Sequence, residues 1–167
     1  SHLWAIRVLF DFLQAEESIE INPFNLLSFP SPKKQEREVL TSKEIEKLYL
    51  SCESSLDRAI LGLFYGCGLR KSEVQALNLR DISFRSRLLY VRSGKGKRRR
   101  VVPLTAKVAE DLRSYYYVER VRMLRKNKDP ERENAFILNK IGGRMLGSSF
   151  WRRLRQLVLK AGIENPG

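Results

Sequence analysis

The chain has 167 residues, of which 43% are hydrophobic, and it carries a formal net charge of +13 with a pI of about 10.1. This length suffices for one packed domain and part of another. The charge indicates a polyanionic partner, usually nucleic acid, although a ribosomal-type or merely soluble basic domain has the same balance. No apolar run approaches the ~20 residues of a membrane span, two cysteines provide no disulfide framework, and the single histidine, His2, argues against a zinc site. We therefore expect a cytoplasmic protein, or a nuclear one if its source has a nucleus, without a membrane partner or a metal.

The charge is unevenly distributed along the chain, which indicates a domain boundary. Residues 1–30 have a net charge of −3, because Arg7 is their only basic residue against four acidic ones, and the other 137 residues carry +16. Residues 2–17 are predicted to form a helix that is apolar on two sides and therefore needs partners on two sides. The prolines and charges of residues 29–38 are typical of an extended linker.

Three helices are predicted after the linker. Thr41 and Glu44 have the spacing of a capping box at the start of the first. Gly66 and Gly68 are placed to end the second, and a short third helix passes through Val74 and Leu77. The core-facing residues of the first two helices are expected to be Ile45, Leu48, Tyr49, Cys52, Leu56, Ala59, Ile60, Leu63 and Phe64.

A β-hairpin is predicted next. Leu88–Arg92 and Arg99–Val102 are β-prone runs that flank a Gly-Lys-Gly-Lys turn. Ala135–Leu138 is a candidate third strand.

Two more helices complete the predicted elements. Thr105 is expected to cap a long helix, and Ser148 or Ser149 to start the last one. Their inward residues are expected to be Val108, Leu112, Tyr115, Val118 and Val121 in the first and Phe150, Leu154, Leu157, Val158 and Ala161 in the second. The elements together predict a mainly α fold of the α+β class, with a small antiparallel β-hairpin or sheet at its edge.

Arg70 is the first candidate for a functional role. It follows the glycine-ended helix and lies near the start of the next one, where a guanidinium and free backbone N–H groups both favour an anion. Glu73 comes one helical turn later and is close enough to orient this guanidinium or the neighbouring backbone. The alternative is a surface arginine with a local ion pair, and position alone does not decide between the two.

Lys95 is the second candidate, 25 residues after Arg70 and between two glycines of the expected hairpin turn. A lysine there can bind a phosphate as a point charge or, with a depressed pKa, donate a proton to a leaving oxygen. Four more basic residues follow it, namely Lys97, Arg98, Arg99 and Arg100. This run favours simple electrostatic contact with nucleic acid, and for Lys95 itself both interpretations stay open.

The last helix is expected to present a basic face. Arg152 and Arg153 lie on this face and are candidates for contact with a DNA backbone, although a solvated charged surface has the same pattern. The three tyrosines at 115–117 are interpreted as packed or partly exposed helix residues rather than as nucleophiles.

Taken together, these motifs resemble the tyrosine recombinases, also called phage-type integrases. The run LTSKEI at residues 40–45 resembles the opening of their catalytic domain. The run GLRKSEVQALNLRDI at residues 68–82 resembles the box around their first catalytic arginine, and GKGKRRRVVPL at residues 94–104 resembles the hairpin with their catalytic lysine. Either motif alone would be weak, whereas the two in this order are specific.

The resemblance implies a domain division and a chemistry. Residues 40–167 would be the N-terminal part of the catalytic domain, residues 1–28 the end of the core-binding domain, and residues 29–39 the linker. The family breaks and rejoins double-stranded DNA through a 3′-phosphotyrosyl bond, without a metal, another cofactor or a small-molecule substrate. By position, Arg70 corresponds to the arginine that clamps the scissile phosphate, Lys95 to the lysine that protonates the 5′-oxygen, and Glu73 to a supporting acidic residue.

The sequence departs from the family pattern at its end. The pattern continues with a His-x-x-Arg box, a further His or Trp, and the nucleophilic tyrosine, and these 167 residues contain none of them. We therefore expect a nucleoid-associated fragment that binds DNA without cleaving it and that self-associates through an exposed apolar flank. The alternative is a natural integrase-like DNA-binding protein without catalytic activity, and the residues encoded after Gly167 distinguish the two. An unrelated RNA-binding protein leaves the Arg70 and Lys95 motifs unexplained.

Overall fold

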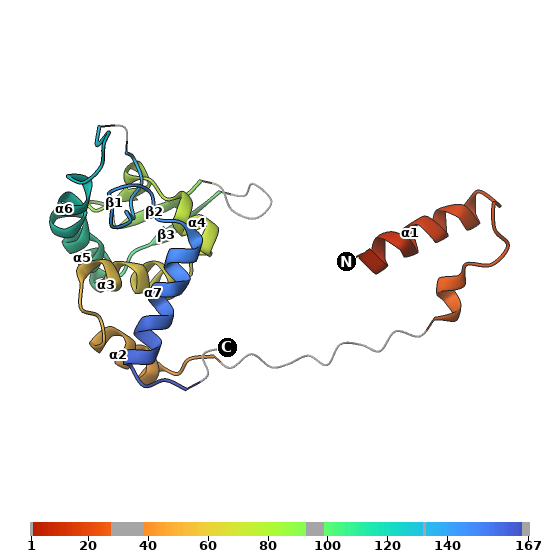
Figure 1. The fold of residues 1–167 in the computed structure, drawn as a ribbon, viewed down its shortest axis with the longest axis horizontal. Helices are drawn as coiled ribbons and strands as arrows, with labels where there is room; N and C mark the ends of the chain where they lie inside the picture. The colour runs from red at the N-terminus through yellow and green to blue at the C-terminus, as the bar shows by residue number, and fades with distance from the viewer. Residues whose placement is uncertain (1, 28–38, 93–98, 132, 165–167) are drawn as a thin grey trace. The chain divides into compact units, whose positions relative to one another are not determined.

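The structure is a computed structural model that describes residues 2–27, 39–92, 99–131 and 133–164. The chain divides into two compact units, a small one, Ser1–Arg37, and a large one, Glu38–Gly167 (Figure 1). The large unit is mainly helical with a three-stranded antiparallel sheet, which confirms the predicted fold class.

The small unit contains the predicted first helix, α1 (His2–Ala15). The helix ends just before Glu17, whose φ of 54° lies in the left-handed region and does not continue a right-handed helix. None of the residues of α1 is buried. The large apolar side chains that it exposes are Leu3, Trp4, Ile6, Val8, Leu9 and Phe12. Both predicted apolar sides of the helix therefore expose side chains within this unit, although Phe10 and Leu13 are half-buried.

A short turn closes the small unit after α1. It forms the element η1 (Pro23–Leu26), and Asn22 caps it by accepting a hydrogen bond from the Phe24 N–H over 2.8 Å. The Asn22 amide also donates to Asp11 over 2.6 Å, and the rings of Phe10 and Phe24 lie 5.7 Å apart. These contacts hold the turn against α1.

The large unit begins with the three predicted helical segments. Their bounds are α2 (Ser42–Leu50), α3 (Ser55–Leu61) continued by the π-helical turn η2 (Gly62–Gly66), and α4 (Lys71–Ala76). The capping box of α2 is confirmed, because the Thr41 N–H donates to the Glu44 carboxylate over 2.7 Å and the Glu44 N–H donates back to the Thr41 hydroxyl. Ser54 and Asp57 form a second capping box at the start of α3.

The predicted hairpin is present, with one correction to the sheet. Strands β2 (Leu88–Val91) and β3 (Arg100–Pro103) pair antiparallel, with Leu89 opposite Val102. The third strand is β1 (Ile82–Ser83), which follows the short 3-10 turn η3 (Leu79–Asp81) and pairs with the other edge of β2.

The prediction of a strand at Ala135–Leu138 was wrong. This segment makes only isolated bridges, Asn78 to Ala135 and Leu138 to Arg144. All four of its residues are buried, at 2% exposure or less. Its backbone is bonded mainly by side chains and loops, since the Leu138 N–H donates to the Tyr115 hydroxyl and the Ala135 carbonyl accepts from Arg120. The segment is therefore a buried part of the core and does not belong to the sheet.

The long helix after Thr105 is interrupted. It consists of α5 (Ala106–Ser114), the π-helical turn η5 (Tyr115–Glu119) and α6 (Arg120–Leu124). Thr105 caps it as predicted, and Val108, Leu112 and Tyr115 are buried. Val118 and Val121, however, are 48% and 42% exposed. The π turn adds a residue to the helical repeat, so positions within it and beyond it, such as Val118 and Val121, leave the predicted inward face.

The last helix, α7 (Gly147–Lys160), starts before both of the predicted serines, after Leu146. Its first N–H group, on Gly147, donates to the Gln75 side chain over 2.9 Å, so a residue of α4 replaces the expected serine cap. Phe150, Leu157 and Val158 are buried as predicted. The helix packs on α4, α3 and α2 and so crosses one side of the unit (Figure 1).

Candidate phosphate-binding site and nucleic-acid interface

Arg70 lies in a sharp turn between η2 and α4. Gly68 has a φ of 59°, which glycine adopts at no steric cost, and this conformation ends the preceding helical run. Leu69 is 4% exposed, and its N–H donates to the Leu63 carbonyl over 3.1 Å, which anchors the turn in the core. The side chain of Arg70, by contrast, is 59% exposed. A fixed backbone therefore presents this cation to solvent.

Glu73 contacts both the backbone and the side chain of Arg70. Its Oε2 accepts the Arg70 backbone N–H over 2.8 Å, and its Oε1 accepts Arg70 Nη1 over 3.1 Å. Glu73 thus binds both the guanidinium and the backbone N–H of Arg70, the two groups that the i, i+3 spacing was expected to place near it. The Arg70 amide, one of the N–H groups expected to be free for an anion, is occupied by this carboxylate.

Arg100, the first residue of β3, is the second partner of Glu73. Its Nη1 and Nη2 donate to the two carboxylate oxygens over 2.6 and 2.8 Å, a bidentate pair. The Glu73 side chain is only 1% exposed, yet the Arg100 bonds, followed by those from Arg70, lower the pKa of Glu73 to about 2 against the effect of burial. The same bonds raise the pKa of Arg100. The three side chains together carry one net positive charge.

The basic run of the hairpin divides into three groups. Lys95, Lys97 and Arg98 lie outside the described residues, so their roles stay predictions. Arg99 is exposed. Arg100, which was expected to face nucleic acid, instead has its two terminal nitrogens on Glu73. It lies on the same side of β3 as Val102, which packs against the core, and this explains the difference.

The two candidate arginines of α7 also differ. Arg152 is exposed, and no ion pair forms on it within the described ranges. Arg153 has a side chain that is 25% exposed and forms an ion pair with Asp57, while its Nη2 donates to the Ser54 hydroxyl over 3.1 Å. Arg153 therefore joins α7 to the capped start of α3, a contact that the predicted DNA role did not include.

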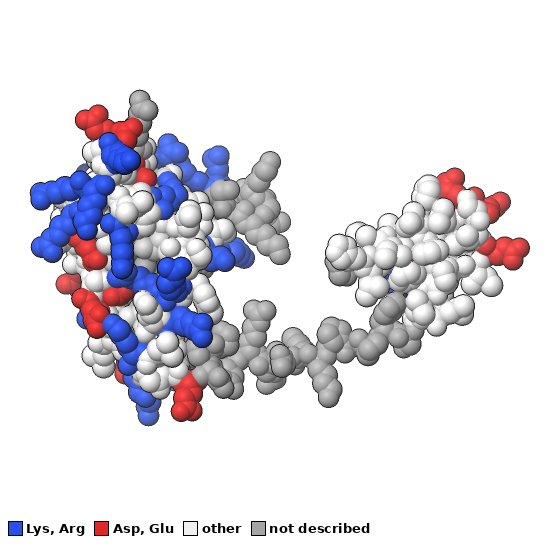
Figure 2. All heavy atoms as spheres, in the orientation of Figure 1, with Lys and Arg blue, Asp and Glu red and all other residues white. Residues whose placement is uncertain are grey.

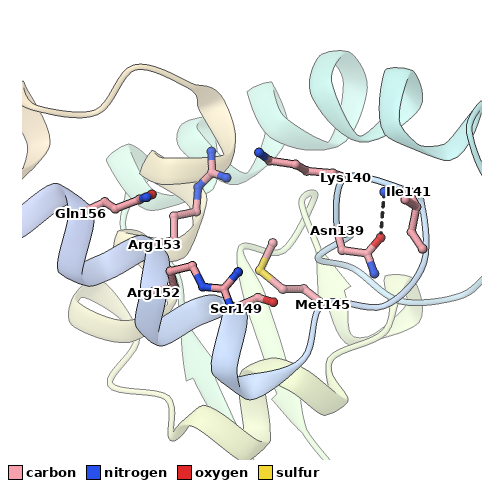
Figure 3. Close-up of a pocket in the computed structure, with 8 residues that line it drawn as sticks. All are labelled: Asn139, Lys140, Ile141, Met145, Ser149, Arg152, Arg153 and Gln156. Carbon is pink, nitrogen blue, oxygen red and sulfur yellow. Dashed lines mark hydrogen bonds between the residues drawn. The ribbon is translucent and has the colours of Figure 1, made fainter.

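An open groove with a volume of about 350 Å³ lies beside these arginines. It is lined by Asn139, Lys140, Ile141, Met145, Ser149, Arg152, Arg153 and Gln156. The loop that carries Lys140 faces α7, and the Lys140 amine and the Arg153 guanidinium point toward the same space (Figure 3). Asn139 holds the loop by accepting the N–H groups of Ile141 and Gly143 over 3.0 and 3.1 Å. Three cations, Lys140 from the loop and Arg152 and Arg153 from α7, thus border one groove.

The surroundings of the groove are basic as well. Figure 2 shows lysine and arginine side chains across the visible face of the large unit. Among the residues with a described placement, no three His, Cys, Asp or Glu side chains gather in a way that could hold a metal ion. No helix in the described ranges is both long enough and apolar enough to cross a membrane.

Comparison with known proteins identifies the family. The model of the phage integrase family matches residues 38–167, which are the residues of the large unit. This chain belongs to that family. The tyrosine recombinase XerC of Natranaerobius thermophilus is 35% identical over 167 residues, which cover 98% of this chain and 56% of that protein. The chain spans about half the length of the curated relatives that it matches.

Solved structures share the fold. The structure of lambda integrase bound to DNA has a TM-score of 0.70 at 19% identity, over 96% of this chain and 55% of that one. A lambda integrase tetramer bound to a Holliday junction has a TM-score of 0.69 at 19% identity, over 97% and 45% of the two chains.

Two parts of the site were not predicted from the sequence, namely the Arg100–Glu73 pair and the position of Lys140 at the groove. The Arg100–Glu73 pair joins residues that are 27 positions apart. Strand alternation could have placed Arg100 beside the inward Val102, although it would not have named the carboxylate. The position of Lys140 beside the groove could not be predicted, because no sequence spacing indicates that its loop lies next to α7.

Proposed function

We propose that this chain is the DNA-binding part of a tyrosine recombinase catalytic domain, with Arg70 as a ligand of the scissile phosphate. The observation that carries the proposal is the exposed Arg70 guanidinium, which follows the buried Leu69 in the turn and is held at one nitrogen by Glu73. In this proposal residues 1–28 are the end of a core-binding domain, and residues 29–39 are the linker.

The proposed chemistry follows from charge. In phosphoryl transfer from DNA to a tyrosine, negative charge gathers on the non-bridging oxygens of the phosphate, and a cation fixed in advance stabilises it. Arg70 can supply that charge, while Lys95 is proposed to protonate the 5′-oxygen as the bond breaks. The covalent phosphotyrosine conserves the bond for rejoining, so no cofactor is required.

These 167 residues contain no His-x-x-Arg box with a following tyrosine, and we infer that they bind DNA without cleaving it. The exposed Arg99 and Arg152, together with the groove at Lys140, are proposed to contact the DNA backbone. Self-association on DNA is proposed by analogy with the lambda integrase tetramer.

Arg70→Ala tests the proposed site in a recombinase chain that includes these residues together with a His-x-x-Arg box and a nucleophilic tyrosine. Cleavage is expected to fall by about 10²–10³-fold or more, because one positioned transition-state charge is lost, while DNA affinity stays within a few-fold. Rates of single-turnover cleavage and binding titrations measure the two effects separately. Arg80→Ala, at another exposed arginine, is the control and should leave cleavage unchanged. Loss of binding with normal cleavage of the bound fraction would make Arg70 a docking residue instead.

A further inference from the structure

The carboxylate of Glu73 has all of its acceptor positions in use. It accepts four hydrogen bonds, two from Arg100 and two from Arg70, and a carboxylate offers about four lone-pair positions. The two Arg100 bonds are the short bidentate ones, at 2.6 and 2.8 Å. Arg70 holds the carboxylate through one guanidinium nitrogen only, over 3.1 Å.

This division leaves Arg70 largely free. A guanidinium has five N–H donors, and the described contacts of Arg70 use one nitrogen, so the rest of its fork faces solvent. If Arg100 were absent, Glu73 would be a buried carboxylate with two open acceptor positions and a strong need for a cation. Arg70 is within reach of that carboxylate. Its guanidinium would then form a bidentate pair with Glu73, and the N–H groups that could bind a phosphate would be occupied.

We infer that Arg100 is a positioning residue that saturates Glu73 and thereby keeps the Arg70 guanidinium available to a phosphate. This inference rests on the proposed function of Arg70. It replaces the direct DNA contact expected for Arg100, whose terminal nitrogens both point at Glu73. It also gives the sheet a role in the site, because β3 delivers the residue that neutralises a carboxylate of α4.

The test observes Arg70 directly in this chain, through the NMR signal of its Nε–H group during titration with a short DNA duplex. In the wild-type chain the duplex should shift the signal. In Arg100→Met the duplex-induced shift should be lost, because Glu73 captures Arg70. In the double variant Arg100→Met with Glu73→Gln the shift should return, because the competing charge is gone.

Two further variants keep the result interpretable. Arg80→Met removes another exposed charge, at a residue outside the proposed DNA contacts, and should retain the Arg70 shift. Arg100→Lys preserves the charge but cannot form the bidentate pair, so it should give a reduced shift even if Arg100→Met folds poorly. The inference is overturned if a folded Arg100→Met or Arg100→Lys keeps the full shift, or if the double variant does not regain it. A wild-type chain whose Arg70 signal ignores the duplex would instead overturn the proposed function, and the inference with it.

Discussion

Arg152 and Arg153 are neighbours on α7, yet their side chains have different surroundings. Arg153 is mostly covered and bound to Asp57 and Ser54, whereas Arg152 is exposed. Sequence assigned both to the same DNA-contacting face, because helical periodicity gives a direction but not the identity of an ion-pair partner nearly a hundred residues away. Two arginines of equal charge therefore have different roles: Arg153 joins two helices, and Arg152 is available for contact with DNA.

A pair of matched substitutions separates the two tasks. Arg153→Met is expected to reduce the free energy of unfolding by about 1–3 kcal/mol, because it deprives a nearly buried carboxylate of its cation. Arg152→Met should change that free energy by no more than about 0.5 kcal/mol and should lower the slope of log affinity against log salt by about 0.9. Urea unfolding and DNA titrations at several salt concentrations measure these effects. Equal stability losses in the two variants would contradict the assignment.

The Glu73 site shows which side-chain contacts sequence can predict. The contact between Glu73 and Arg70 follows from an i, i+3 spacing on one helix and needs no tertiary structure. The contact with Arg100 depends on the register of β3 against β2 and on how the sheet packs on α4. Local spacing contains neither of these, so the stronger of the two contacts was not predictable.

At the scale of elements, the loop beside α7 is built around one glycine. Gly142 has a φ of 83°, and a Cβ there would lie 2.5 Å from the Met123 carbonyl oxygen. The Asn127 amide also donates to the Gly142 carbonyl over 2.8 Å, which holds the loop on the end of α6. This close approach fixes the loop that carries Lys140 toward the groove.

Gly142→Ala should therefore be costly. We expect the free energy of unfolding to fall by about 2–4 kcal/mol, from the left-handed backbone strain together with the clash against a backbone oxygen. Gly143→Ala is the matched control, since a Cβ there would lie no closer than 3.6 Å to its neighbours, and its effect should stay within about 0.5 kcal/mol. Thermal or urea unfolding of both variants decides the matter. A small effect at Gly142 would show that the loop is not held as described.

The helices also show that sequence predicts local contacts better than tertiary ones. Capping residues such as Thr41 and Thr105 marked the helix starts correctly, because a cap is a local hydrogen bond. The π turns η2 and η5 were not predicted, and η5 moved Val118 and Val121 to the surface. At η2, a Cβ on Gly66 would lie 2.6 Å from a methyl group of Val108. The close packing of η2 on α5 thus explains why residue 66 is a glycine. Hydrophobic periodicity in the sequence does not predict this contact.

For the whole molecule, the charge shift along the chain agrees with two units of different character. Residues 1–30 carry a net charge of −3, and α1 exposes most of its apolar side chains, while the large unit has its own buried core and contains 28 of the 32 basic residues. The phage integrase match extends over the large unit alone. The mainly helical fold with its edge hairpin was predictable, because strong local patterns and the family motifs agree.

We propose that these 167 residues bind DNA and do not form the phosphotyrosyl bond. A nicked suicide duplex, which traps any covalent intermediate by releasing a short fragment, tests it most directly. We expect a salt-sensitive complex on a native gel and only free protein after denaturation, whereas a recombinase with a complete catalytic domain, run in parallel, should give a covalent adduct. A denaturation-resistant adduct of this chain, or no complex on the native gel, would overturn the proposal.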